Sequence, residues 1–193
     1  MEKNELIKKL REETLVSFSL CKEALENSNW DLEKAKDYLR KKGALKFSSR
    51  AKQTNSGIIE SYVHQGKIGV LVELKCETDF VASNSEFKKL AHEIALQIAS
   101  MKPKYVSDDQ ISQEEKEEFK KIVLEQDPSI LSKPKDVQEK ILNGKMEKWY
   151  QEVVLLKQPW IKDQNLKIED LINENSLKFG EKIQVGRFYI LEL

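Results

Sequence analysis

The sequence predicts an α+β fold in which a three-helix bundle precedes a core of helices packed on a three-stranded antiparallel sheet. Three observations support this prediction. Apolar residues recur every three or four positions within residues 3–42, the period of an amphipathic helix. From Gly57 the apolar period changes to two, the period of a strand, and it returns in the closing segment EKIQVGRFYILEL after several helical segments. Strands followed by helices and then by a further strand are typical of an α+β layer.

The composition is that of a folded protein without a dominant charge. The 193 residues suffice for a small domain beside a medium one, and 39% hydrophobic residues are enough for a core. Thirty-three basic residues balance 33 acidic ones, which argues against binding to nucleic acid or an anionic membrane through the overall field. The charged N-terminus lacks the apolar run of a signal peptide. We therefore expect a cytoplasmic protein that binds neither nucleic acid nor membrane directly.

Three short helices are expected before residue 43. The first carries Leu6, Ile7 and Leu10 on one face, and the second, over roughly residues 18–27, carries Phe18, Cys21 and Leu25. Asp31 follows a break in the pattern and can cap the third helix. We expect Gly43 to end this helix, because glycine readily adopts the left-handed conformation found after many helices.

A basic segment follows the bundle. Residues 40–52, RKKGALKFSSRAK, contain six basic residues and no acidic one. They could contact RNA or phosphate, but apart from Phe47 they lack the aromatic side chains on which bases stack. We therefore interpret the segment as a solvated linker. The predicted helical domain covers residues 1–46, the linker residues 47–56 and the core domain residues 57–193.

The core begins with a predicted hairpin, GIIESYVHQGKIGVLVELKC. Gln65-Gly66 fits a two-residue turn, and alternate residues of the second strand form one apolar face. An S-x-x-E capping box, Ser83 and Glu86, indicates the start of the next helix. The apolar stripe of that helix consists of Phe87, Leu90, Ala91, Ile94 and Ile98.

The remainder of the core is predicted to be helical until the last strand. Residues 112–125 are strongly charged, which places this helix at the periphery. A longer amphipathic helix ends before Pro159, and residues 168–172 form a short one. The tail then returns as the third strand of the sheet.

The sequence holds no recognisable enzyme chemistry. It contains neither a G-x-x-x-x-G-K-[ST] loop nor a G-x-G-x-x-G motif. The only histidines, His64 and His92, lack a second ligand at metal-binding spacing, and no Ser or Cys has a paired base. Cys21 and Cys76 each lie in an apolar pattern, which favours buried free thiols over a disulfide. We expect no cofactor, no metal site and no enzymatic activity.

The junction between the hairpin and the next helix, KCETDFVASNSEF at residues 75–87, carries an acidic–aromatic pair, Asp79-Phe80. A large apolar side chain in an exposed connection must either fold back onto the core or contact another molecule. From position alone, Phe80 could cap the sheet as a core residue or face outward. Asp79 could equally be a helix-cap carboxylate.

Segments along nearly the whole chain resemble the elongation factor Ts family. LREETLVSFSLCKEALENSNWDLEKAKDYLRKKGALK is similar to the ubiquitin-associated-type (UBA-like) bundle with which the family begins. CETDFVA at residues 76–82 resembles the family's C-x-T-D-F-V-A stretch at a strand–helix junction. KWYQEVVLLKQPWIKD is similar to a late core helix of the family, and IQVGRFYILEL to its final strand.

The resemblance implies a translation elongation factor that acts as a guanine nucleotide exchange factor. Members of the family bind elongation factor Tu (EF-Tu), a GTP-binding protein, in its GDP-bound and nucleotide-free forms and speed the loss of GDP. By the resemblance, Thr78, Asp79, Phe80 and Val81 form the segment that enters EF-Tu and disturbs the magnesium side of the nucleotide site. The bundle is expected to bind another face of EF-Tu through Phe18 and Ser19.

The chain departs from the family in two respects. TLVSFSLC replaces the usual T-G-x-G-M-M-D-C, so Phe18 and Ser19 stand where two methionines are common. Residues 57–193 can hold only one sheet subdomain, whereas long members carry two and a protruding coiled coil. The resemblance therefore implies the short form, in which two chains pair as a homodimer and assemble with two EF-Tu molecules.

Two other functions compete with this one. A UBA-type protein-binding adaptor would act without exchange activity, but Leu15-Val16-Ser17 does not supply the Met-Gly-aromatic loop of ubiquitin readers. An RNA-binding accessory protein would use residues 40–52, and its binding would weaken steeply with salt. Measurement of GDP release from EF-Tu distinguishes the exchange factor from both.

Overall fold

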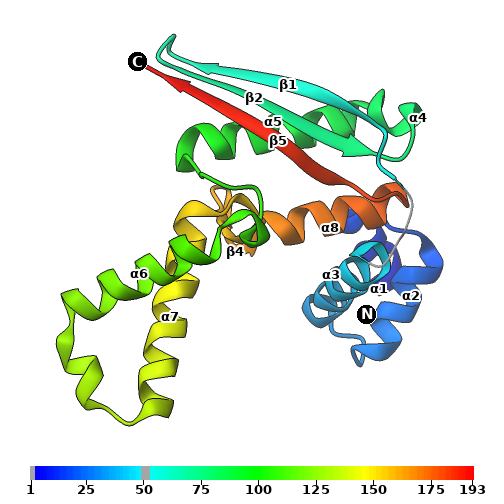
Figure 1. The fold of residues 1–193 in the computed structure, drawn as a ribbon. Coiled ribbons are helices and arrows are strands. Elements are labelled where there is room, and N and C mark those ends of the chain that lie inside the picture. The colour runs from blue at the N-terminus through cyan, green and yellow to red at the C-terminus, as the bar shows by residue number, and fades with distance from the viewer. Residues whose placement is uncertain (1–2, 49–52) are drawn as a thin grey trace.

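The protein consists of a helical bundle, a sheet layer and a projecting helical arm (Figure 1). The computed structural model describes residues 3–48 and 53–193. The observed α+β architecture, with three helices before a three-stranded antiparallel sheet, confirms the predicted fold class. Within the described ranges, no helix combines the length and the apolar character needed to cross a bilayer.

The bundle contains the three predicted helices, α1 (Lys3–Thr14), α2 (Phe18–Asn27) and α3 (Leu32–Ser48). Asp31 caps α3 as expected, because its Oδ1 accepts a hydrogen bond from the Lys34 N–H at 3.1 Å. The helices enclose a small apolar core, made by Ile7, Leu10, Val16, Cys21, Ala24, Leu25, Ala35 and Leu39 of the bundle and completed by Leu177 from later in the chain.

The prediction that Gly43 ends the third helix is wrong, since α3 continues through it. Gly43 lies where α3 packs on α8 (Ile168–Phe179). A Cβ at this position would be 2.9 Å from the Asn173 carbonyl oxygen and 3.0 Å from the Leu177 side chain. The glycine therefore allows a close helix approach instead of a helix end. Residues 49–52 of the predicted linker lie outside the described part of the chain.

The sheet is antiparallel with strand order β1-β2-β5, comprising β1 (Ser56–His64), β2 (Ile68–Cys76) and β5 (Gln184–Glu192). The predicted hairpin is confirmed. Gln65 and Gly66 both have positive φ, 50° and 68°, and the Lys67 N–H donates to the His64 carbonyl at 2.9 Å. The register pairs His64 with Ile68, so three residues, Gln65, Gly66 and Lys67, connect the strands, one more than the predicted two-residue turn. The two left-handed residues match the twist of the flanking strands.

Helix α5 (Ser85–Met101) covers one face of the sheet (Figure 1). All five residues of its predicted stripe are buried. The predicted capping box is wrong by one residue, because the helix is capped by Asn84, whose Oδ1 accepts from the Glu86 N–H at 2.8 Å. Ser83 instead ends an additional one-turn helix, α4 (Asp79–Ala82), which the sequence did not predict.

A helical arm projects away from the sheet (Figure 1). It is formed by α6 (Gln113–Gln126), the 3₁₀ turn η2 (Pro128–Ser132) and α7 (Lys135–Val153). The rings of Phe119 and Trp149 stack with their centroids 4.5 Å apart and join the two helices. The strongly charged α6 is therefore peripheral, as predicted.

Short segments that the sequence did not predict flank the arm. They are η1 (Asp108–Gln110) before it, and η3 (Leu155–Lys157), β3 (Pro159–Trp160) and β4 (Asp163–Lys167) on the return after it. The buried side chain of Gln97 on α5 holds this return. Its Nε2 donates to the Gln158 Oε1 and the Pro159 carbonyl, both at 3.1 Å, and its Oε1 accepts from the Ile161 N–H at 2.9 Å.

Candidate functional site

The segment at residues 78–82 forms a single helical turn directly after β2. Cys76 ends the strand with a fully buried side chain, and Thr78 has extended backbone angles, φ −132° and ψ 153°. The Thr78 hydroxyl oxygen accepts a hydrogen bond from the Val81 N–H at 3.4 Å, which caps α4. The Ser83 N–H donates to the Asp79 carbonyl at 2.9 Å. Hydrogen bonds therefore close the turn at both ends.

This turn has a buried side and an exposed side. Val81 and Ala82 lie in the main apolar core, whereas Asp79 is exposed and Phe80 is 85% exposed. Successive residues of a helical turn point about 100° apart, so burial of Val81 and Ala82 directs Phe80 outward. The reading in which Phe80 caps the sheet as a core residue is therefore wrong. The four predicted residues are consecutive, but Val81 faces the protein interior.

A carboxylate from the other end of the chain holds the start of this turn. The Glu181 Oε2 accepts hydrogen bonds from the N–H groups of Glu77 and Thr78, both at 3.1 Å, and its Oε1 accepts from the Thr78 hydroxyl at 2.6 Å. In return, the Glu77 Oε1 accepts from the Lys182 N–H at 2.9 Å. Sequence reasoning missed Glu181. Gly180 marks the end of α8, but nothing in the sequence pairs the next residue with a segment about 100 positions earlier.

The two cysteines are free and buried, which confirms the prediction for both. Burial raises the pKa of the Cys76 thiol, and the charge of Glu181 raises it further. Burial likewise raises the pKa of the Cys21 thiol. Because the thiolate is the reactive form, both side chains are suited to packing and not to nucleophilic chemistry.

The second predicted site lies on the bundle, well apart from α4 (Figure 1). Phe18 and Ser19 open α2 and are both exposed, and Ser17 caps the helix by accepting from the Leu20 N–H at 3.4 Å. Leu15, also exposed, adds a second apolar side chain next to them. Each of the two predicted sites therefore presents an exposed aromatic side chain, Phe80 on α4 and Phe18 on α2.

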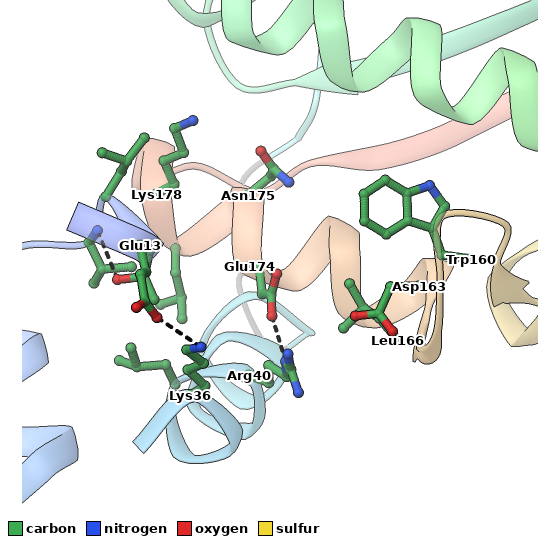
Figure 2. A pocket seen from close by; sticks show the side chains of 14 residues that line it. Glu13, Lys36, Arg40, Trp160, Asp163, Leu166, Glu174, Asn175 and Lys178 are labelled. Carbon is green, nitrogen blue, oxygen red and sulfur yellow. Dashed lines mark hydrogen bonds and ion pairs between the residues drawn. The ribbon is translucent and has the colours of Figure 1, made fainter. Parts of the chain in front are cut away.

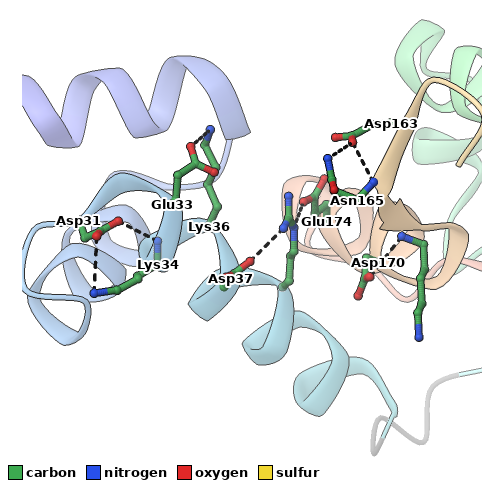
Figure 3. A network of polar contacts seen from close by, with 11 residues as sticks. Asp31, Glu33, Lys34, Lys36, Asp37, Asp163, Asn165, Asp170 and Glu174 are labelled. Atoms are coloured by element: carbon green, nitrogen blue, oxygen red, sulfur yellow. Dashed lines mark hydrogen bonds and ion pairs between the residues drawn. The ribbon is translucent and has the colours of Figure 1, made fainter. Parts of the chain in front are cut away.

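A cavity of about 340 Å³ lies between the bundle and the core. Figure 2 shows Glu13 and Lys36 on its bundle side, joined by an ion pair of 2.8 Å. Arg40 reaches across to Glu174 on α8 at 2.5 Å (Figure 2). The same guanidinium also pairs with Asp37, whose Oδ1 is 2.9 Å from the Arg40 Nη1; Figure 3 shows Asp37 and Glu174 within this network of polar contacts. These charges pair with one another, so the cavity is a polar junction between the bundle and the core.

Among the described residues, no group of three or more His, Cys, Asp or Glu side chains could hold a metal ion. At the candidate site, Phe80 offers an apolar contact and Asp79 beside it offers a charge.

Comparison with known proteins gives a consistent result. The family model described as Elongation factor TS matches residues 22–193. The elongation factor Ts of Thermodesulfovibrio yellowstonii is 48% identical over 185 residues, which cover 95% of this chain and 92% of that protein. The Thermotoga neapolitana protein of the same name is 49% identical over 186 residues, covering 95% and 93%. That of Thermotoga maritima is 48% identical over 191 residues, covering 98% and 94%. The similarity spans the bundle and the core together.

Proposed function

This chain belongs to the elongation factor Ts family of translation elongation factors, and we propose that it is a guanine nucleotide exchange factor for EF-Tu that acts in the cytoplasm. It binds EF-Tu in the GDP-bound and nucleotide-free forms and promotes GDP release by inserting the segment Thr78–Val81 near the magnesium and phosphate site. No covalent bond is made or broken, so the protein is not an enzyme in the usual sense.

The observation that carries this proposal is the exposure of Phe80 on a turn that is otherwise anchored. The ring is 85% exposed although the next two residues are buried. Transfer of a Phe side chain from water into an apolar gap contributes about 1.5–3 kcal/mol. Because little of this ring is covered in the free protein, nearly all of that free energy is available when a partner receives it.

Nucleotide exchange follows if the apolar gap that receives the Phe80 ring is open only in the state of EF-Tu that binds the nucleotide weakly. A ligand shifts an equilibrium only by the difference in its affinity for the two states. The magnesium ion is among the largest charges at a phosphate site, so disturbing its shell weakens the phosphate contacts around it. By linkage, GDP must weaken the binding of this protein as much as this protein weakens the binding of GDP.

The exposed pair Phe18 and Ser19 is proposed as a second contact with EF-Tu. It lies on the bundle, away from the nucleotide-releasing turn. Phe18→Ala should therefore weaken the binding of EF-Tu and leave the rate of GDP release at saturation unchanged. An unchanged affinity in a titration of the release rate would remove this contact from the proposal.

Two copies of the chain are proposed to pair through the open face of the sheet, the face opposite α5. This open sheet face carries exposed apolar side chains from all three strands, namely Ile59, Val63, Leu71, Tyr189 and Leu191. They are neighbours in the register, because Leu71 is paired with Tyr189, and Gly69 is paired with both Val63 and Leu191. An apolar patch that crosses a whole sheet is typical of an interaction surface.

Sedimentation measures the proposed homodimer directly. Leu71→Glu places a charge at the centre of the open sheet face and should convert the dimer to a monomer. Leu131→Glu, at an exposed apolar position in the arm, is the matched control and should remain dimeric. A monomeric wild-type chain at micromolar concentration contradicts the pairing.

The exchange proposal is tested by the release of fluorescent GDP from EF-Tu. The wild-type chain should accelerate release. Phe80→Ala should slow release roughly ten- to hundredfold, the ratio that corresponds to about 1.5–3 kcal/mol, and Asp79→Ala should slow it less. Leu131→Ala removes an exposed apolar side chain elsewhere and should release GDP at the wild-type rate. Equal rates for Phe80→Ala and the wild type, with both bound to EF-Tu, would favour the UBA-type adaptor without exchange activity.

A further inference from the structure

The carboxylate of Glu181 accepts three hydrogen bonds, and all three come from the two residues that precede α4. Two donors are the backbone N–H groups of Glu77 and Thr78, and the third is the Thr78 hydroxyl, at 3.1, 3.1 and 2.6 Å. Hydrogen bonds to an ionised acceptor are shorter and stronger than those between neutral groups. Because all three hydrogen bonds to this carboxylate come from one short segment, Glu181 fixes the path of the chain as it leaves β2.

The contact is reciprocal, because the Lys182 N–H donates to the Glu77 carboxylate at 2.9 Å. Two adjacent residues of the β2–α4 junction are therefore joined to two adjacent residues of the α8–β5 connection. That connection is in turn fixed to the core, since Ile183 is buried and its N–H donates to the Ser176 hydroxyl at 3.1 Å. Glu181 thus ties the junction to a fixed part of the fold.

Thr78 transmits this restraint to the exposed ring. Its hydroxyl has one hydrogen, which it donates to Glu181, and this leaves the oxygen lone pairs to accept from the Val81 N–H. Helix α4 has only four residues, and a single helical turn is not stable by itself. Its direction therefore depends on its two attachments, the Thr78–Glu181 contact at the start and the burial of Val81 and Ala82 at the end.

We propose that Glu181 is a positioning residue for nucleotide exchange, which holds α4 in the orientation that presents Phe80 to the partner. The inference rests on the proposed function. Glu181 acts through Thr78 and need not touch EF-Tu. Substitution of Glu181 leaves the Phe80 side chain itself unchanged but lets α4, which carries that side chain, change its orientation.

A double-mutant cycle tests this role, with GDP release from EF-Tu as the measurement. Glu181→Ala should slow release on the order of tenfold, because three charge-assisted hydrogen bonds are lost. Glu181→Gln keeps one oxygen acceptor and should slow release less. In the Phe80→Ala background, Glu181→Ala should change the rate by less than about twofold, since residues that act through one another are not additive. Glu169→Gln, a carboxylate on α8 that pairs with Lys157 at 3.6 Å, is the control and should release GDP at the wild-type rate.

Amide hydrogen exchange of the peptide that covers residues 77–84 provides a readout independent of EF-Tu. Glu181→Ala should accelerate exchange in this peptide and leave the peptides of α5 protected as in the wild type. Two results would overturn the inference. One is that residues 77–84 are as protected in Glu181→Ala as in the wild type. The other is that Glu181→Ala slows GDP release by the same factor in the Phe80→Ala background as in the wild type. If Phe80→Ala alone releases GDP at the wild-type rate, the proposed function itself fails, which is a different outcome from additivity.

Discussion

Phe80 and Phe87 offer a paired measurement of whether the exposed ring contributes to folding. They are seven positions apart, and Phe80 is 85% exposed whereas Phe87 is fully buried. Since Phe80 is 85% exposed, only about one seventh of its surface is covered. Full burial of Phe contributes about 1.5–3 kcal/mol, so Phe80→Ala should lower the free energy of unfolding by at most about 0.5 kcal/mol.

Phe87→Ala should behave very differently. The Phe87 ring packs edge-on against Phe179, with centroids 6.2 Å apart and an interplanar angle of 79°, at the contact between α5 and α8. Truncation of a buried Phe removes its transfer free energy and leaves a cavity, which together cost about 3–5 kcal/mol. The ratio of the two losses should therefore be sixfold or more by these estimates.

Urea unfolding followed by circular dichroism gives both free energies. In a chain of this length 1 kcal/mol corresponds to a shift in Tm of about 2–4 °C, so Phe80→Ala should lower Tm by less than about 2 °C and Phe87→Ala by more than about 6 °C. Comparable losses for the two variants would falsify the assignment of Phe80 to the surface. With a small loss of stability, the slower GDP release predicted for Phe80→Ala would report on binding to EF-Tu and not on unfolding.

Three further predictions concern the frame around the site. Gln97→Leu leaves the Ile161 N–H without its acceptor and should lower the free energy of unfolding by about 1–3 kcal/mol, measured by urea unfolding. Gly43→Val should cost about 1–3 kcal/mol through crowding against α8; no loss in the same assay refutes the close approach. The Tyr105 hydroxyl donates to the Glu115 carboxylate and lowers the pKa of that carboxyl. This hydrogen bond therefore stabilises the fold at pH values above the ordinary pKa of Glu, and the stabilisation is lost as the pH falls through the lowered pKa of Glu115. Tyr105→Phe should raise this pKa in an NMR titration.

Elements with a clear period were predictable from the sequence. The stripe on α5 and the alternation in β2 each extend over many residues, so the buried face follows from spacing alone. The position of the hairpin turn was predictable too, because Gly66 favours the left-handed conformation that the turn requires, although the connection is one residue longer than predicted.

Local signals failed where tertiary contacts decide the outcome. A glycine can end a helix or permit two helices to pack closely. Only the position of α8 shows that Gly43 permits close packing. Ser83 and Asn84 are both good caps, and the presence of α4 gave the role to Asn84. The pairing of β3 with β4 is too short to leave a periodic pattern.

The candidate site was predictable only in part for the same reason. The resemblance identified the segment that contains Phe80, and the structure shows how the ring is held outward. Glu181 could not be found in this way, because its role depends on a contact between the two ends of the core domain. A positioning residue has no sequence signal of its own when its partner is distant in the chain.

The packing of α3 on α8 connects the two proposed contacts with EF-Tu. Leu177 of α8 is buried in the apolar core of the bundle, and Arg40 of α3 pairs with Glu174 of α8. A flexible linker alone would let Phe18 and Phe80 sample many separations, whereas this packing holds them on one frame. When two contacts are held at the separation that a partner requires, the second forms without a further loss of translational and rotational freedom. Gly43→Val touches neither contact, yet it should weaken the binding of EF-Tu while GDP release at saturation continues. The packing of α3 on α8 would then affect nucleotide exchange only by fixing the separation between Phe18 and Phe80.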